Sequence, residues 1–233
     1  MRRYPTESII NCRDLGGWPC PGGMTAKGRA IRCGIPLPPT PNDYALLRQL
    51  GVRAIVDLRG RGEAALYPSP FAADPDFDYY HIPLYEANPA TARDSRPLTA
   101  LYREILTDFG PGFAAVLRLL PTLPQPFLFH CFCGKDRTGL LSALLLDAAG
   151  VDSADITADY EVSFTYIKPF FEREIAAGSP LIWQTDLSRL RTDAAVMEET
   201  LSFLRHAYGG ARGYFAAIGL TAPEIAAVER LLR

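Results

Sequence analysis

Hydrophobic positions along the chain form two kinds of pattern, short apolar runs and stripes with helical spacing. The short runs predict buried strands at residues 30–33, 52–58, 78–84 and 127–129. Between them, apolar residues at helical spacing predict helices at residues 41–50, 98–109, 113–120 and 138–149. Because strands alternate with helices, we expect an α/β fold with a central, largely parallel sheet that is flanked by helices.

The part of the chain after residue 150 shows almost only helical patterns. Residues 221–224 form a capping box that opens a last helix. No linker separates this part, so we expect extra C-terminal helices packed on a single domain over residues 1–233. Residues 16–23 (GGWPCPGG) predict a turn, and the polar residues 85–97 predict a loop.

Composition narrows the class of protein. The 233 residues are 48% hydrophobic and 21% charged, which is typical of a globular protein. The net charge of −2 offers no basic excess for nucleic acid, and no apolar run reaches the roughly 18 residues of a membrane span. Arg2 and Arg3 precede no apolar segment, which argues against a secretory signal. The five unevenly spaced cysteines include no Cys-x-x-Cys pair, so we expect no zinc site and a reducing, cytoplasmic location, with export without a classical signal as the alternative.

Residues 130–139 (HCFCGKDRTG) lie between a predicted strand and a predicted buried helix. The free N–H groups and the dipole at a helix N-terminus favour an anion, and Gly134 lets the backbone curl close to it. Cys131 opens this loop and Arg137 closes it. A nearby helix N-terminus and guanidinium stabilise a thiolate, and the guanidinium can bind two phosphoryl oxygens at once. The loop therefore predicts a nucleophile, an oxyanion cradle and a clamp for a phosphoryl group.

The same loop resembles the HCxxGKDRTG active-site loop of bacterial atypical protein-tyrosine phosphatases. Other stretches resemble that family in the same order along the chain: residues 11–17 (NCRDLGG), residues 55–59 with Glu63, Asp159-Tyr160 with Ser163, and the C-terminal tail. The resemblance implies a cysteine-phosphatase fold, a phosphocysteine intermediate, and no metal or other cofactor. It implies phosphorylated partners that range from phosphotyrosine and phosphoserine/threonine in proteins to phosphoinositides.

On this interpretation Cys131 attacks phosphorus and Arg137 binds the equatorial oxygens. The leaving oxygen needs a proton, and Asp136 is the expected acid because the resembled family is proposed to use its loop aspartate. Asp57 is the alternative, since it ends an apolar strand near the sheet edge where α/β proteins bind ligands. Otherwise Asp57 is a strand-end carboxylate that pairs with Arg59 or Arg137.

The neighbouring side chains are expected to bind substrate. Lys135 adds a second positive charge unless it is solvated, and the Thr138 hydroxyl can donate to the Cys131 sulfur unless it only begins the helix. Arg59 and Glu63 are expected to pair at the rim of the site, with a structural role favoured for Glu63. The full expected substrate-binding set is Phe132, Cys133, Gly134, Lys135, Thr138, Asp57 and Arg59.

Two positions depart from the resembled family. Cys12 stands where an aromatic residue is commoner, and Cys133 stands where a small residue is expected. We expect Cys133 to act as a small packing residue, with a regulatory disulfide as the less favoured alternative. His130 is expected to order the loop through hydrogen bonds.

Three other functions stay open. A phosphoinositide or inositol phosphate phosphatase would use the charge of Lys135. A thiol oxidoreductase would pair Cys131 with Cys133, although a one-residue gap is tight for a disulfide. A pseudophosphatase would only bind phosphorylated partners, and the presence of Cys131, Asp136 and Arg137 argues against it.

Overall fold

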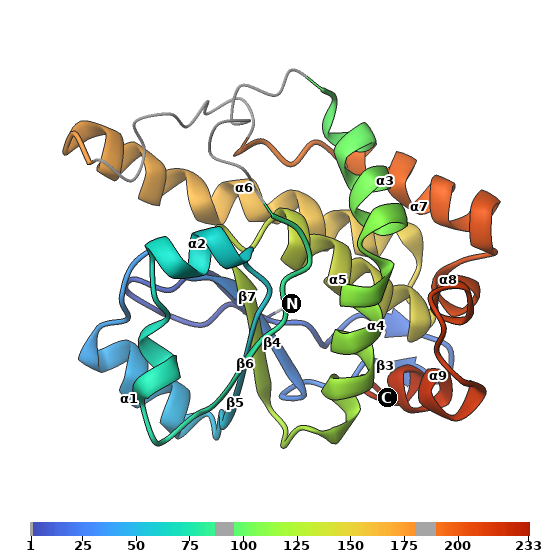
Figure 1. Ribbon diagram of the computed structural model, residues 1–233, viewed down its shortest axis with the longest axis horizontal. Helices are drawn as coiled ribbons and strands as arrows, with labels where there is room; N and C mark the ends of the chain where they lie inside the picture. Colours follow the sequence, from blue (N-terminus) through green and yellow to red (C-terminus); the bar gives the residue numbers. More distant parts are fainter. Residues whose placement is uncertain (1, 87–95, 180–189) are drawn as a thin grey trace.

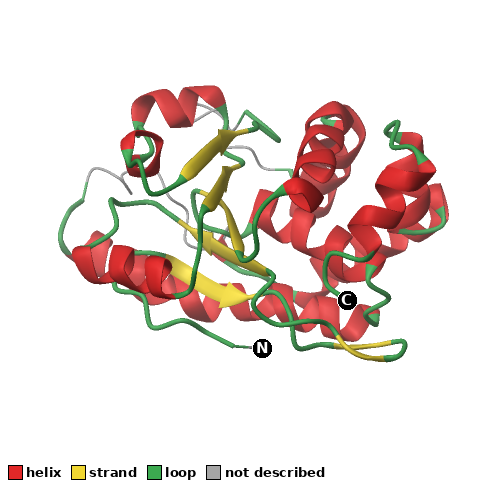
Figure 2. Ribbon diagram, turned by 90° about the horizontal axis from the view of Figure 1, so that it is seen from below, coloured by secondary structure: helices red, strands yellow, loops and turns green. Residues whose placement is uncertain are grey.

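A five-stranded sheet lies at the centre of the protein (Figures 1 and 2). The fold is that of a computed structural model, which describes residues 2–86, 96–179 and 190–233. The strand order is β1 (Ile10–Asp14), β4 (Ala30–Gly34), β7 (Phe127–Cys131), β5 (Ala54–Asp57) and β6 (Asp78–His81). The last four of these are mutually parallel, and β1 runs antiparallel to β4 at one edge. The predicted α/β fold with a largely parallel sheet is confirmed.

Helices surround this sheet (Figure 1). They are α1 (Pro41–Gln49), α2 (Arg61–Leu66), α3 (Leu98–Asp108), α4 (Gly110–Leu119), α5 (Asp136–Ala148), α6 (Ser153–Ala176), α7 (Ala194–Tyr208), α8 (Ala211–Ala217) and α9 (Ala222–Glu229). Thr40 and Asp43 form a capping box that begins α1, and Thr221 and Glu224 do the same for α9. The extra C-terminal helices that the sequence predicts are therefore present.

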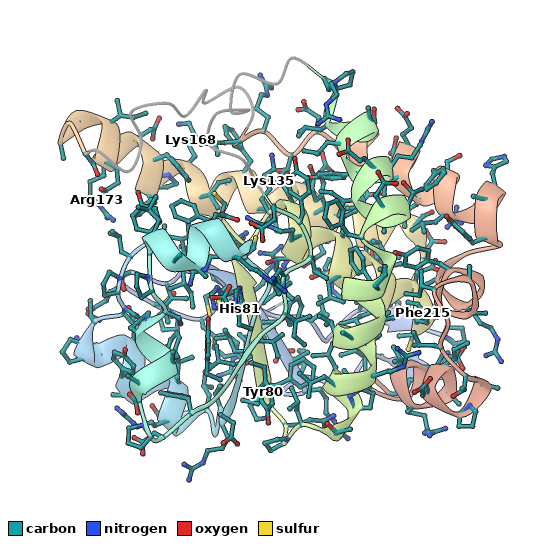
Figure 3. The ribbon with its side chains drawn as sticks, viewed as in Figure 1. Tyr80, His81, Lys135, Lys168, Arg173 and Phe215 are labelled. Atoms are coloured by element: carbon teal, nitrogen blue, oxygen red, sulfur yellow. The ribbon has the colours of Figure 1, made fainter. Side chains whose placement is uncertain are left out.

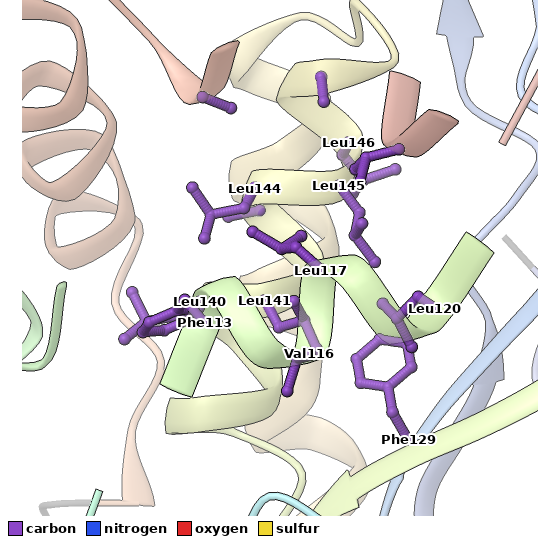
Figure 4. Packing of buried hydrophobic residues seen from close by; sticks show 14 of the residues in the cluster. Phe113, Val116, Leu117, Leu120, Phe129, Leu140, Leu141, Leu144, Leu145 and Leu146 are labelled. Carbon is purple, nitrogen blue, oxygen red and sulfur yellow. The ribbon is translucent and has the colours of Figure 1, made fainter. Parts of the chain in front are cut away.

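Successive side chains of the strands point to opposite faces of the sheet and pack into two separate hydrophobic cores. On β7, Phe127 and Phe129 pack with α3, α4 and α5, whereas Leu128 packs on the opposite face with Leu47 of α1. Figure 4 shows α4 packed on α5, with Phe129 beside the α4 end. Because α5 is buried on most sides, its position against the sheet is fixed, and its first turn lies at the carboxyl end of β7.

The structure corrects the sequence analysis in the N-terminal region. Residues 16–23 are not all turn, because β2 (Pro19–Cys20) and β3 (Gly23–Met24) pair within and beside them as a small antiparallel ribbon. Strand β1 was not predicted, since its five residues include three polar side chains that are buried by partners elsewhere in the fold. Most of the loop expected at residues 85–97 lies outside the described residues. No helix in the described part of the chain is both long and apolar enough to cross a bilayer.

Candidate active site

The loop that follows β7 leads from the centre of the sheet into a buried helix. β7 ends at Cys131 and α5 begins at Asp136, so residues 132–135 form the connection. Figure 3 shows Lys135 at this end of α5. The first N–H groups of a helix have no partner in a preceding turn, so they and the helix dipole favour an anion within the curve of the loop.

Two glycines allow this loop to lie directly on the end of β4. Gly134 has a φ of +68°, which residues with a side chain rarely adopt. A Cβ on Gly134 would lie 2.4 Å from the carbonyl carbon of Cys33, and a Cβ on Gly34 would lie 2.3 Å from the carbonyl carbon of Cys133. Backbone therefore packs on backbone, and β4 supports the curvature of the loop from beneath.

Buried donors hold the carbonyl groups of the loop. Asn11 Nδ2 donates to the Gly134 carbonyl at 2.8 Å and to the Cys133 carbonyl at 3.4 Å. Arg32 Nη2 donates to the same Gly134 carbonyl at 2.9 Å. The planar peptide unit directs its C=O and N–H to opposite sides, so carbonyls anchored beneath the loop turn N–H groups toward its inside. Asn11 has a φ of +57°, an uncommon conformation for a side-chain-bearing residue.

A pair of buried arginines shares one carboxylate below the loop. Arg13 Nε donates to Asp159 Oδ1 at 2.9 Å, and Arg32 Nη1 donates to Asp159 Oδ2. Burial acts to raise the pKa of Asp159, but the two arginines hold that pKa below its usual value. Burial and the adjacent Arg13 lower the pKa of Arg32 to about 10, which leaves Arg32 charged at neutral pH. The cluster therefore carries a net positive charge under the loop, where it favours a bound anion.

Arg137, in the first turn of α5, is held by a carboxylate from α2. Its Nη2 donates to Glu63 Oε1 at 3.0 Å, and its Nη1 donates to Glu63 Oε2 and, at 3.3 Å, to the Tyr85 carbonyl. Burial acts to lower the pKa of Arg137, but the hydrogen bonds to Glu63 raise it above its ordinary value. The expected pairing of Glu63 with Arg59 is wrong, because the start of α2 directs Glu63 to Arg137.

Asp136 is the more exposed of the two candidate acids, with 34% of its side chain accessible. Tyr102 Oη donates to its Oδ1 at 2.7 Å, and Lys135 Nζ lies 3.2 Å from the same oxygen. The Lys135 side chain is only 2% exposed, so it is not a solvated surface lysine. Lys135 is the last residue of the loop, and its Nζ contacts the neighbouring Asp136.

Asp57 is buried and saturated with donors. Its carboxylate accepts hydrogen bonds from the Arg59 backbone N–H and guanidinium, and from Tyr79 Oη at 2.8 Å. Burial acts to raise the pKa of Asp57, but the charge and hydrogen bonds of Arg59 hold it well below its usual range. Asp57 is therefore a strand-end carboxylate paired with Arg59, which is the structural role that the sequence left open for it beside the role of acid. The guanidinium of Arg59 also donates to the Tyr67 carbonyl at 2.9 Å, so it is engaged within the protein.

The remaining loop residues have mixed surroundings. Phe132 packs against Tyr67, with ring centroids 5.9 Å apart, and the Tyr67 side chain is 36% exposed. The Thr138 hydroxyl is buried without a hydrogen-bond partner among the described residues, so the expected bond to the Cys131 sulfur is not formed. Burial raises the pKa of the Cys133 thiol.

His130 lies under the loop. Its Nδ1 is 3.1 Å from the Cys131 carbonyl, and its Nε2 is 3.8 Å from Asp57 Oδ2. Burial lowers the pKa of His130, which is consistent with a neutral ring that orders the backbone. Within the described parts of the chain, no three His, Cys, Asp or Glu side chains are grouped so that they could hold a metal ion.

Several supporting residues escaped the sequence analysis. Gly34 and Arg32 belong to a short strand whose sequence predicts only that it is buried in a sheet. Tyr102 is one position of an apolar helical stripe, which predicts only that it packs in the core. A buried arginine within a strand was the one available signal, because such a charge needs a partner.

Comparisons with known proteins show the family of the chain. The chain matches the tyrosine phosphatase family over residues 4–233. It is 36% identical over 199 residues to a tyrosine-protein phosphatase of Nostoc commune, a match that covers 80% of this chain and 68% of that protein. It is 30% identical over 149 residues to the triple specificity protein phosphatase PtpB of Mycobacterium tuberculosis, covering 50% of this chain and 54% of PtpB. The chain thus spans about half to two-thirds of these relatives.

Among solved structures, the crystal structure of P. aeruginosa TpbA resembles the chain with a TM-score of 0.41 and 19% identity, over 80% of this chain and 91% of that one.

Proposed function

The chain belongs to the tyrosine phosphatase family, and from this premise we propose that it hydrolyses phosphomonoesters through a phosphocysteine intermediate on Cys131. The observation that carries the proposal is the arrangement of the loop. Cys131 opens it at the end of β7, Arg137 lies in the first turn of α5, and buried donors hold the Gly134 carbonyl beneath the loop. Such a cradle matches the negative charge that a phosphoryl group spreads over its equatorial oxygens.

The reaction proceeds in two steps. In the first, the Cys131 thiolate attacks phosphorus, the S–P bond forms, and the P–O bond to the leaving group breaks while Asp136 gives that oxygen its proton. In the second, water attacks phosphorus, the Asp136 carboxylate takes a proton from the water, and the S–P bond breaks. Inorganic phosphate leaves, and the thiolate is restored. Asp57 is a poor donor for the first step, because its partners hold it ionised.

We propose protein phosphotyrosine as the preferred substrate, with phosphoserine and phosphothreonine as further ones. The rings of Phe132 and Tyr67 stand together at the loop, where they can contact the ring of an aryl phosphate. The name of the M. tuberculosis relative, a triple specificity phosphatase, supports a range wider than phosphotyrosine alone. We also propose a reducing, cytoplasmic setting, which rests on the odd number and uneven spacing of the five cysteines in the sequence.

Turnover of p-nitrophenyl phosphate in EDTA, with and without dithiothreitol, tests this function. We expect metal-independent, reductant-dependent turnover that Cys131→Ser abolishes while vanadate still binds. Arg137→Lys should also lose most activity, because an ammonium cannot make two parallel contacts with the phosphoryl oxygens. Full activity in Cys131→Ser would refute the proposal, and phosphopeptide binding without turnover by the parent would indicate a pseudophosphatase.

A further inference from the structure

Two buried tyrosines connect Asp136 to the helical layer. Tyr102 of α3 donates from its Oη to Asp136 Oδ1 at 2.7 Å, and Tyr102 Oη lies 2.8 Å from Tyr160 Oη of α6. The two rings meet edge to face with centroids 6.0 Å apart. Their side chains are 0% and 1% exposed, so water does not compete for these hydroxyls.

The direction of the hydrogen bonds follows from the number of protons. Each tyrosine hydroxyl has one proton to donate. Since the Tyr102 proton goes to Asp136 Oδ1, the bond between the hydroxyls must be donated by Tyr160. Burial raises the pKa of both tyrosines, so both stay protonated and neither replaces Asp136 as the acid. The chain therefore runs from Tyr160 through Tyr102 to Oδ1 of Asp136.

Lys135 reinforces the same oxygen, since its Nζ lies 3.2 Å from Oδ1. A protonated carboxyl has one hydroxyl oxygen and one carbonyl oxygen, and only the carbonyl oxygen accepts two donors well. With Tyr102 and Lys135 both directed at Oδ1, the proton of the acid belongs on Oδ2. Among the described residues, Arg137 is a further charged group near Asp136, and Glu63 holds it. Asp193 and Arg32 are the charged groups near Tyr160.

We propose that Tyr102, supported by Tyr160, is a positioning residue that holds Asp136 by Oδ1 and leaves Oδ2 to carry the proton to the leaving group. This inference rests on the proposed function, in which Asp136 is the general acid. It gives the acid a fixed orientation from α3 and α6, although Asp136 itself is one-third exposed. Proton transfer depends on such orientation, because donor and acceptor must come within hydrogen-bond distance.

The test compares kcat/KM for a phosphotyrosine peptide with that for 2,4-dinitrophenyl phosphate, whose leaving group needs no proton. We expect Tyr102→Phe to lower kcat/KM for the peptide about tenfold and kcat/KM for 2,4-dinitrophenyl phosphate by less than about twofold, because the substitution disturbs only the protonation of the leaving group. The pH profile of the peptide reaction should also change while that of 2,4-dinitrophenyl phosphate does not, because only the peptide reaction needs the proton of the acid. Tyr160→Phe should give a smaller change in the same direction.

Tyr214→Phe is the matched control. Tyr214 is also 0% exposed and also bonds to α3, through the Leu106 carbonyl at 2.8 Å, but has no contact with Asp136. It should leave both the substrate ratio and the pH profile unchanged. Equal losses on the two substrates in Tyr102→Phe, with an unmoved pH profile, would overturn the inference.

Asp136→Asn separates the inference from the function beneath it. If Asp136→Asn loses peptide activity selectively and Tyr102→Phe does not, the positioning role fails while the acid assignment stands. If Asp136→Asn shows no such selectivity, the acid assignment itself fails. In the double variant, Tyr102→Phe should add no further selectivity to Asp136→Asn, because the two act as one unit.

Discussion

Gly34→Ala should disable the enzyme by displacing the backbone of the loop, although no residue of the loop itself is replaced. The added Cβ would lie 2.3 Å from the carbonyl carbon and 2.6 Å from the carbonyl oxygen of Cys133, and 2.7 Å from the Gly134 nitrogen. All three are backbone atoms, so no side chain can rotate away. An ordinary contact begins at 3.4 Å, so the loop must move by about 1 Å from β4. A misplacement of this size costs on the order of 100-fold in rate, and the strain costs about 1–3 kcal/mol of stability.

Steady-state kinetics on p-nitrophenyl phosphate and thermal unfolding measure the two effects. Gly62→Ala is the control, because its Cβ would meet only Glu86 Oε2 at 3.9 Å. We expect the control to keep the parental kcat/KM, and Gly34→Ala to lose both kcat/KM and vanadate affinity while staying folded. Parental kinetics in a folded Gly34→Ala protein would show that close packing on β4 does not set the shape of the cradle.

The remaining predictions concern partners of the loop. Glu63→Gln should lower kcat/KM on p-nitrophenyl phosphate by roughly tenfold, because Arg137 loses a charged two-point partner; unchanged kinetics would contradict this. Lys135→Ala should lower kcat/KM more for a phosphoinositide than for p-nitrophenyl phosphate. Equal losses on the two substrates would show that Lys135 contributes only a general positive charge. Cys133→Ala should recover from peroxide with dithiothreitol as well as the parent does, whereas lost recovery together with a disulfide-linked peptide would indicate a protective bridge. Because its pKa is lowered in the folded state, ionised Asp159 stabilises the fold at pH values above the ordinary pKa of an aspartate, and this stability is lost as the pH falls. The Asp159→Asn variant should have a smaller free energy of unfolding at pH 7, and that free energy should change less with acid pH, as measured by urea unfolding.

Local sequence determined the loop that we propose as the reacting part of this protein. The strand, loop and helix around residues 127–149 are encoded contiguously, so Cys131, Asp136 and Arg137 are brought together by a single turn of chain. Apolar periodicity and capping residues likewise placed most helices within a few positions of where they lie. These features depend on neighbours in sequence, which a pattern can capture.

The partners of those residues were decided only by the tertiary structure. Glu63 reaches Arg137 from 74 positions away, Tyr102 reaches Asp136 from 34, and Arg32 reaches the Gly134 carbonyl from 102. Each of these residues lies on a helix or strand whose sequence pattern is explained by its secondary structure and burial alone. The pattern therefore gives no sign of a contact with the active-site loop. The sequence specifies which groups need a partner, because a buried charge or carbonyl without one is costly. Which partner it receives depends on how the sheet and helices pack, and that is a property of contacts distant along the chain.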